Sequence, residues 1–134
     1  MKREIIHTDQ VPGSTLYSHA VKVGNTVFLS GIVGFNPLTK KVDAPTIEEQ
    51  TNLAIQNCSS ILRAAKASLD DVVQVTVLLK DSSHFDRMNA AYSKHFPTNP
   101  PARAVTKLGV DLPNILVSIM MTAVILDGSS EGPG

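Results

Sequence analysis

The 134-residue sequence has one cysteine, no tryptophan and no excess of charge of either sign. A single cysteine, Cys58, excludes an internal disulfide and a cysteine-based metal site. The 12 basic and 12 acidic residues leave no net field that would attract nucleic acid or an anionic membrane. Two tyrosines and four phenylalanines provide few rings to stack on bases. These shortages argue against nucleic-acid binding and against nuclease function.

Long hydrophobic runs are also missing, since no apolar stretch approaches the roughly 18 residues of a membrane span. The single cysteine favours a reducing compartment, and residues 1–7 lack the apolar core of a secretory signal. The cytoplasm is the first expectation and the mitochondrial matrix the alternative. The length fits a single domain over residues 1–127, followed by a flexible Gly/Ser-rich tail over residues 128–134.

Strand and helix patterns succeed one another along the chain. Strands are predicted over residues 4–7, 17–23, 26–30, 72–80, 103–108 and 115–126, and helices over residues 47–67 and 85–96. Gly24-Asn25 has the composition of a hairpin turn. The pairs Thr46/Glu49 and Ser83/Asp86 have the spacing of helix N-termini. This order predicts an α+β fold, a six-stranded sheet with two helices on one face.

The segment 115–126 is apolar with little alternation. A strand that is apolar on both faces must be covered on both faces. Two helices can cover one face, and the chain has no further helix for the other. A second copy of the chain is the best candidate to cover it, so we expect a homo-oligomer.

Familiar ligand motifs are absent: there is no glycine-rich phosphate loop, no HExxH and no paired cysteines. The histidines lie at positions 7, 19, 84 and 95, with no spacing that suits a metal, and each is interpreted as a surface or structural residue. Cys58 falls on the apolar side of the first helix, where cysteine acts as a small hydrophobe. We therefore expect no metal.

Arg103 is the strongest candidate for chemistry. It follows Pro100-Pro101, which end the preceding helix, and alanines flank it at the start of a strand. This leaves room for a small anion, and the planar fork of arginine fits a carboxylate through two parallel hydrogen bonds. A structural ion pair is the alternative role. Strand alternation places Val105 on the same face as Arg103.

Three weaker candidates accompany Arg103. Ser30-Gly31 ends a predicted strand, where glycine either permits close approach of a ligand or simply breaks the strand. Tyr17 follows a turn and could equally pack at a sheet edge. Asn89, beside Met88 on the second helix, could form a polar contact between subunits.

Taken in order, these segments resemble the Rid (RidA/YjgF) family of reactive intermediate (enamine/imine) deaminases. The resemblance spans almost the whole chain and rests on residues 17–25, residues 28–31 with Asn36-Pro37, residues 88–92 and residues 101–103. It implies a chorismate-mutase-like fold assembled as a homotrimer with three clefts between subunits. The implied reaction is hydrolysis of the enamine/imine products of PLP-dependent dehydratases to 2-keto acids and ammonia, without a cofactor.

The resemblance also implies roles for individual residues. Arg103 would bind the substrate carboxylate, and Tyr17 would be the second catalytic residue. The rest of the cleft would be lined or supported by Ser30, Gly31, Ile32, Asn89, Val105 and Met121.

This sequence departs from the best-known family members at three places. They have Arg-Ser-Cys-Val where this chain has residues 103–106, Arg-Ala-Val-Thr, and glutamine where it has Ile32. They also have a glutamate in the last strand that helps to hold water, where this chain has Met120 or Met121. Three functions follow: an imine deaminase or repurposed enzyme, a module that binds a small carboxylate without turnover, and a ribonuclease, which the composition disfavours.

Overall fold

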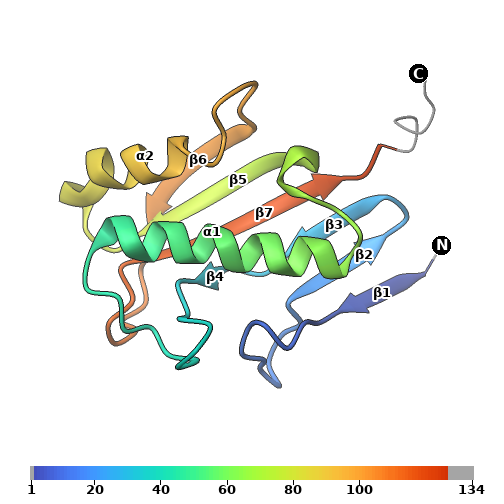
Figure 1. Cartoon of the computed structure of the whole chain (residues 1–134), viewed down its shortest axis with the longest axis horizontal. Helices are drawn as coiled ribbons and strands as arrows, with labels where there is room; N and C mark the ends of the chain where they lie inside the picture. The colour runs from blue at the N-terminus through green and yellow to red at the C-terminus, as the bar shows by residue number, and fades with distance from the viewer. Residues whose placement is uncertain (1, 127–134) are drawn as a thin grey trace.

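The computed structural model describes residues 2–126, which form one mixed sheet with two helices across one face (Figure 1). The strands are β1 Arg3–Ile6, β2 Ala20–Val23, β3 Thr26–Leu29, β4 Ile32–Val33, β5 Val72–Leu79, β6 Ala102–Lys107 and β7 Val117–Val124. The helices are α1 Ile47–Ala64 and α2 Phe85–Ser93, with short 3-10 turns η1 Leu69–Asp71 and η2 Ser82–His84. The predicted α+β class is confirmed. The predicted tail over residues 128–134 lies outside the described residues.

The strand order is β1-β2-β3-β7-β5-β6, and β4 also pairs with β7. Among the strand pairs of residues 2–126, only β5–β6 is parallel. The predicted count of six strands is wrong by one, because Ile32–Val33 forms β4 beside β7. Two residues between Gly31 and Gly34 are too few to show a periodic pattern, so this strand could not be predicted from the sequence.

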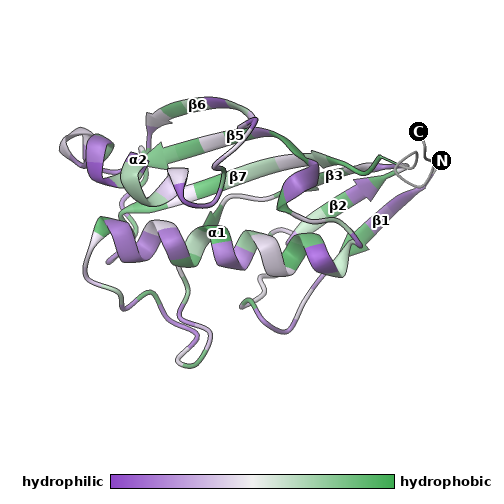
Figure 2. Cartoon of the chain, turned by 45° about the horizontal axis from the view of Figure 1, so that its top comes forward, coloured by the Kyte–Doolittle hydropathy of each residue, from purple (hydrophilic) through white to green (hydrophobic). Residues whose placement is uncertain are grey.

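Helix α1 follows the predicted N-terminus. The Thr46 hydroxyl accepts a hydrogen bond from the Glu49 amide at 3.1 Å, as an N-cap should. At the other end, Nζ of Lys22 donates to the carbonyl oxygen of Ala65 at 3.1 Å, where a cation complements the helix dipole. Figure 2 shows hydrophobic and hydrophilic residues alternating along α1, and its hydrophobic side packs on the sheet.

Helix α2 begins differently from the prediction. Ser83 is not its N-cap, because the Asp81 carboxylate accepts from the Ser83 amide at 2.9 Å and caps η2 instead. The α-helix then starts at Phe85 and ends at Ser93, before the predicted limit. A short 3-10 turn thus replaces the expected first turn.

Two side-chain contacts tie α2 to α1. Nε and Nη2 of Arg87 each donate to the carboxylate of Glu48 at 2.8 Å. Nε2 of His95 lies 2.9 Å from Oδ1 of Asn52. These contacts fix α2 beside β6, where Arg103 lies (Figure 1).

The two faces of the sheet are unlike, as β7 shows. Its residues Val117, Ile119, Met121 and Ala123 are buried under the helices. The alternate residues point to the opposite face, which no helix of residues 2–126 covers; Ser118 is still buried there, whereas Met120, Thr122 and Val124 are partly or largely exposed. This open face is more mixed than the expected doubly apolar strand, yet it exposes large hydrophobic side chains such as Phe28 and Met120. Within residues 2–126, no helix combines the length and hydropathy needed to cross a bilayer.

Candidate functional site

Tyr17 belongs to a loop and not to the predicted strand, because β2 starts only at Ala20. The ring of buried His19 organises this loop: its Nδ1 accepts from the Thr8 amide at 3.2 Å and its Nε2 donates to the Pro12 carbonyl at 2.9 Å. The interpretation of His19 as a structural histidine is confirmed. With both ring nitrogens occupied, the histidine holds the segment that leads into exposed Tyr17.

A β-bulge shapes the chain at Ser30-Gly31. Phe28 pairs with Thr122 and Ile32 with Ile119, so the three residues 29–31 face only two residues of β7. The Ser30 hydroxyl donates to the Ser18 carbonyl at 2.6 Å, which joins the bulge to the loop that carries Tyr17.

Gly31 packs closely against a side chain of β7. A Cβ at this position would lie 2.8 Å from Oγ of Ser118, closer than real Cβ atoms approach. Gly31 therefore lets β4 run close beside β7. The bare backbone that results borders a groove of about 560 Å³.

This groove brings together four of the residues that the sequence predicted: Tyr17, Ser30, Gly31 and Ile32. Its other walls are mainly apolar and include Val11, Pro12, Val33, Leu108, Val110, Leu112 and Ile115. We call the four predicted residues the bulge half-site. The groove thus combines a few polar groups with mainly apolar walls.

Arg103 lies on β6, directly opposite Val75 of β5. Its Nη1 donates to Oδ1 of Asn89 on α2 at 2.8 Å. No carboxylate of residues 2–126 lies within ion-pair distance of Arg103, because the ion pairs of this part of the chain join Lys80 to Asp111 and Arg87 to Glu48. The alternative role of Arg103 as a structural ion pair is therefore wrong, and its charge is left for another anion.

Val105 shares the face of Arg103 through the β5–β6 register, as alternation predicted. It is half-buried and lines a small cavity of about 300 Å³ together with Phe85 and Lys107. We call Arg103, Asn89 and Val105 the arginine half-site.

Two aromatic residues at this half-site were not predicted from the sequence. Cζ of Arg103 lies 4.8 Å from the centroid of the Tyr92 ring and 6.0 Å from that of Phe85. Both fall within the helix predicted over residues 85–96, and neither is among the predicted site residues. Their helical spacing from Asn89 was the available sign, because positions 85, 89 and 92 share one helix face. Burial raises the pKa of Tyr92, and the charge of Arg103 opposes that rise.

The two half-sites do not meet within one chain. The bulge lies level with Arg103 along the strands, since Met121 pairs with Val75 and Val75 with Arg103. However, β7 and β5 stand between them, a lateral separation of three strand spacings, or about 14 Å. A small imino acid cannot span this distance.

The adjacent methionines of β7 have opposite surroundings. Met121, which the resemblance placed in the cleft, is 1% exposed in the core beneath the helices. Met120 is 42% exposed on the open face, opposite the Ser30-Gly31 bulge. Of the two positions considered for the family glutamate, Met120 is the one that borders the bulge half-site.

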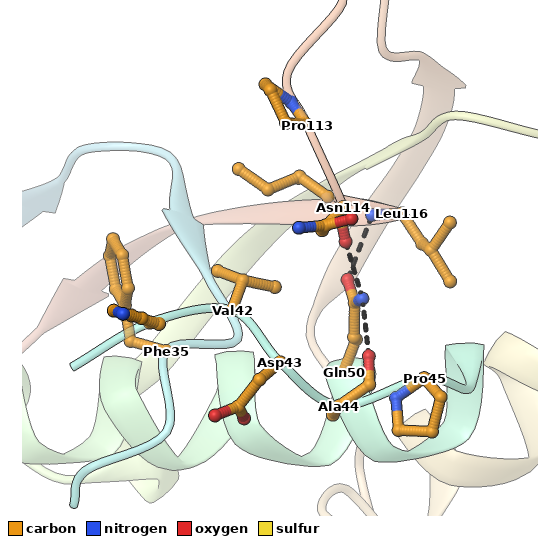
Figure 3. A pocket seen from close by; sticks show the side chains of 11 residues that line it. Phe35, Val42, Asp43, Ala44, Pro45, Gln50, Pro113, Asn114 and Leu116 are labelled. Atoms are coloured by element: carbon orange, nitrogen blue, oxygen red, sulfur yellow. Dashed lines mark hydrogen bonds between the residues drawn. The ribbon is translucent and has the colours of Figure 1, made fainter. Parts of the chain in front are cut away.

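A separate concavity of about 860 Å³ lies where residues 35–45 approach residues 113–116 (Figure 3). Its base is held by buried Gln50, whose Nε2 donates to the carbonyls of Ala44 at 2.9 Å and Asn114 at 2.7 Å. Oε1 of Gln50 accepts from the Leu116 amide at 2.9 Å. Gln50 thus connects the two loops by hydrogen bonds. None of the predicted site residues lines this concavity.

Within residues 2–126, no three histidine, cysteine or acidic side chains gather closely enough to hold a metal ion. Cys58 is fully buried, and burial raises the pKa of its thiol far above the ordinary value. The thiol donates weakly to the Ile119 carbonyl, with sulfur and oxygen 3.7 Å apart. It packs as the predicted small hydrophobe.

Comparison with known proteins yields one family. The model described as endoribonuclease L-PSP matches residues 8–125. Reactive Intermediate Deaminase A of Arabidopsis thaliana is 34% identical, over 93% of this chain and 67% of its own. The human 2-iminobutanoate/2-iminopropanoate deaminase is 37% identical, over 76% of this chain and 75% of its own. The crystal structure of Escherichia coli TdcF with bound serine is 28% identical with a TM-score of 0.84, covering 92% of this chain and 99% of its own.

Proposed function

Because this chain belongs to the endoribonuclease L-PSP family, also called the YjgF/Rid family, we propose that it hydrolyses small enamine/imine intermediates to 2-keto acids and ammonia. The names of its plant and human relatives support deamination of such compounds. The intermediates would come from PLP-dependent dehydratases, and the hydrolysis itself needs no cofactor.

The observation that carries this proposal is the unpaired charge of Arg103. Its guanidinium is held by Asn89 and has no carboxylate partner among residues 2–126. A guanidinium in this state binds a substrate carboxylate through two parallel hydrogen bonds. The TdcF structure with bound serine supports the same ligand chemistry, since serine carries a carboxylate.

The reaction asks little beyond orientation. A water oxygen bonds to the electrophilic imine carbon, the nitrogen takes up protons, and the C–N bond then breaks to release ammonia and leave a C=O group. Arg103 fixes the carboxylate next to this carbon, which converts a random encounter into an oriented one. The Tyr17 hydroxyl, beside the Ser30-Gly31 backbone, supplies hydrogen bonding for the water.

We further propose a homotrimer whose clefts join the bulge half-site of one subunit to the arginine half-site of the next. Two features support it: the half-sites lie about 14 Å apart within one chain, and the open face exposes Phe28 and Met120. A neighbouring subunit on that face would cover these side chains. It would also bring the second half-site into reach.

Met120 makes a specific difference to the chemistry. The thioether at this position is a poor acceptor for the attacking water, in contrast to the family glutamate. General-base assistance contributes about two to four orders of magnitude, so we expect slow turnover. The same observation favours the second candidate, a trimer that binds a small carboxylate without hydrolysis.

A coupled assay tests the proposed function. A PLP-dependent dehydratase generates the imine from serine or threonine, and keto-acid release is followed with and without this protein. We expect acceleration by the wild type, loss of it in Arg103→Ala and partial recovery in Arg103→Lys, since a point charge cannot reproduce the bidentate fork. Arg63→Ala is the matched control, because the Arg63 guanidinium donates to the hydroxyls of Ser59 and Ser60 on α1 and belongs to neither half-site. No acceleration by the wild type, together with tight 2-ketobutyrate binding, would favour the binding module.

A further inference from the structure

The guanidinium of Arg103 lies against two aromatic rings of α2. We propose that Phe85 and Tyr92 are positioning residues of the arginine half-site, whose rings hold the Arg103 fork in the orientation that receives a carboxylate. This inference rests on the proposed function and assigns to that site two residues for which no site role was predicted.

Helix geometry places the two rings and the amide on one surface. Phe85, Asn89 and Tyr92 are separated by four and three residues, so they lie on the same face of α2. That face meets β6 at Arg103, whose Cζ is 4.8 Å from the Tyr92 centroid and 6.0 Å from the Phe85 centroid. These distances lie within the range over which a ring attracts a cation, about 6 Å.

We call the Phe85 and Tyr92 rings the aromatic cradle. This cradle restrains the guanidinium without using its hydrogen-bond donors. Arginine has about five N–H donors, and among the described residues one of them donates, to Asn89. The rings attract the charge through their π faces and therefore leave the other donors for an anion. A carboxylate or aspartate in place of the rings would have neutralised the charge and competed with the substrate.

The ring and the hydroxyl of Tyr92 can be assigned different roles. Tyr92 is 6% exposed, and its hydroxyl has no hydrogen-bond partner among the described residues. A buried hydroxyl without a partner contributes no bond to the fold. The ring is thus the part of Tyr92 that acts on Arg103, and removal of the hydroxyl alone should leave the clamp intact.

Binding of 2-ketobutyrate to the assembled protein, measured by calorimetry, tests this proposal with two substitutions at one position. Tyr92→Phe keeps the ring and should bind within about 2-fold of the wild type. Tyr92→Leu removes it and should weaken binding by about 3- to 30-fold. Phe85→Leu should show a smaller loss, because Phe85 is exposed and further from Cζ. Its exposure also makes it a usable variant if Tyr92→Leu does not fold.

The neutral amide of 2-ketobutyrate provides the readout that a general structural role would not move. Loss of the cradle should reduce affinity for the carboxylate much more than affinity for the amide, whereas a distorted pocket would reduce both alike. Wild-type affinity in Tyr92→Leu and Phe85→Leu, or an equal loss in Tyr92→Phe and Tyr92→Leu, would overturn the inference. If the wild type itself binds no carboxylate, the proposed function fails with it. Binding that depends on Arg103 but not on the rings overturns this inference alone.

Discussion

The two faces of β7 differ in how far their hydrophobic side chains are buried. On the covered face, Ile119 and Met121 are buried by helices of the same chain, and the core is complete. On the open face, Met120 and neighbouring Phe28 remain 42% and 49% exposed. Side chains of similar hydrophobicity thus have a partner on one side and none on the other within residues 2–126.

This contrast separates stability from proposed function along a single strand. Residues of the covered face hold the helices on the sheet, and a change there should act on folding. Residues of the open face border the Ser30-Gly31 bulge, and a change there should act on assembly and turnover. Met120 and Met121 are adjacent in the chain, so they provide the sharpest comparison.

The largest expected effect is that of Met121→Glu. The new carboxylate would be buried without a partner, at a cost of several kcal/mol, and we expect the chain not to fold. Met120→Glu should fold, because its side chain reaches the open face beside the Ser30-Gly31 bulge. There the new carboxylate would lie in the proposed cleft in contact with water, so the trimer should form and hydrolyse imine faster than the wild type. Circular dichroism and the coupled assay measure the two outcomes, with Met121→Leu as the volume-conserving control. Equal stability of the two glutamate variants would remove the distinction between the faces.

The second-largest expected effect is loss of assembly in Phe28→Glu, on the open face. A charge there should prevent the proposed trimer, since it would be buried without a partner, while leaving the monomer folded. Leu38→Glu is the matched control, because Leu38 is 91% exposed in a loop. We expect sedimentation to give trimers for the wild type and Leu38→Glu, and folded monomers for Phe28→Glu. A wild type that is monomeric at micromolar concentration would contradict the trimer.

Two glycines that flank β4 should differ in cost. A Cβ at Gly34 would lie 2.7 Å from the backbone oxygen of Gln50, which cannot move aside, so Gly34→Ala should cost about 1–3 kcal/mol. A Cβ at Gly31 would meet only the Ser118 hydroxyl, which can rotate. Urea unfolding should therefore show a smaller loss for Gly31→Ala, restored largely by adding Ser118→Ala. A cost for Gly31→Ala that persists in the double variant would point to strain in the bulge itself.

The smallest expected effect is a pH dependence at the contact between α1 and α2. Burial, with a smaller contribution from Lys94, lowers the pKa of His95 below its usual 6.5. The folded state therefore binds a proton less readily than the unfolded state, so stability is full above about pH 6.5 and declines as the pH falls below it. His95→Gln should flatten the stability profile between pH 6.5 and 5 in urea titrations. If His95→Gln leaves the slope of stability against pH unchanged, groups other than His95 cause the pH dependence. Glu48 and Asp81 are not expected to contribute in this window, because their lowered carboxyl pKa values place their titration at lower pH.

Much of this fold could be predicted because its local patterns agree with its tertiary contacts. The Thr46 cap and the alternation of Arg103 with Val105 both appear in the structure as predicted. The predictions failed where tertiary contacts decide the outcome. Strand β4 is two residues long and depends on β7, and Asp81 displaced Ser83 as the capping residue.

The candidate site was predicted as a set of residues but not as an arrangement. Tyr17, Ser30, Gly31 and Ile32 do gather around one groove. Met121 does not join them, because the strand register places its side chain in the core. That register depends on strand pairing, which the sequence alone does not reveal. The same register explains why Arg103 lies three strands away from the groove.

In the proposed trimer, each working cleft combines the arginine half-site of one subunit with the bulge half-site of another. Arg103→Ala and Tyr17→Ala should each be inactive alone. When equal amounts are unfolded and refolded together, random trimers should contain intact clefts at about one quarter of positions, and imine hydrolysis should recover to about that fraction of the wild type. No recovery in verified mixed trimers, with Arg103→Ala and Tyr17→Ala subunits in the same assembly, would contradict a cleft shared between subunits.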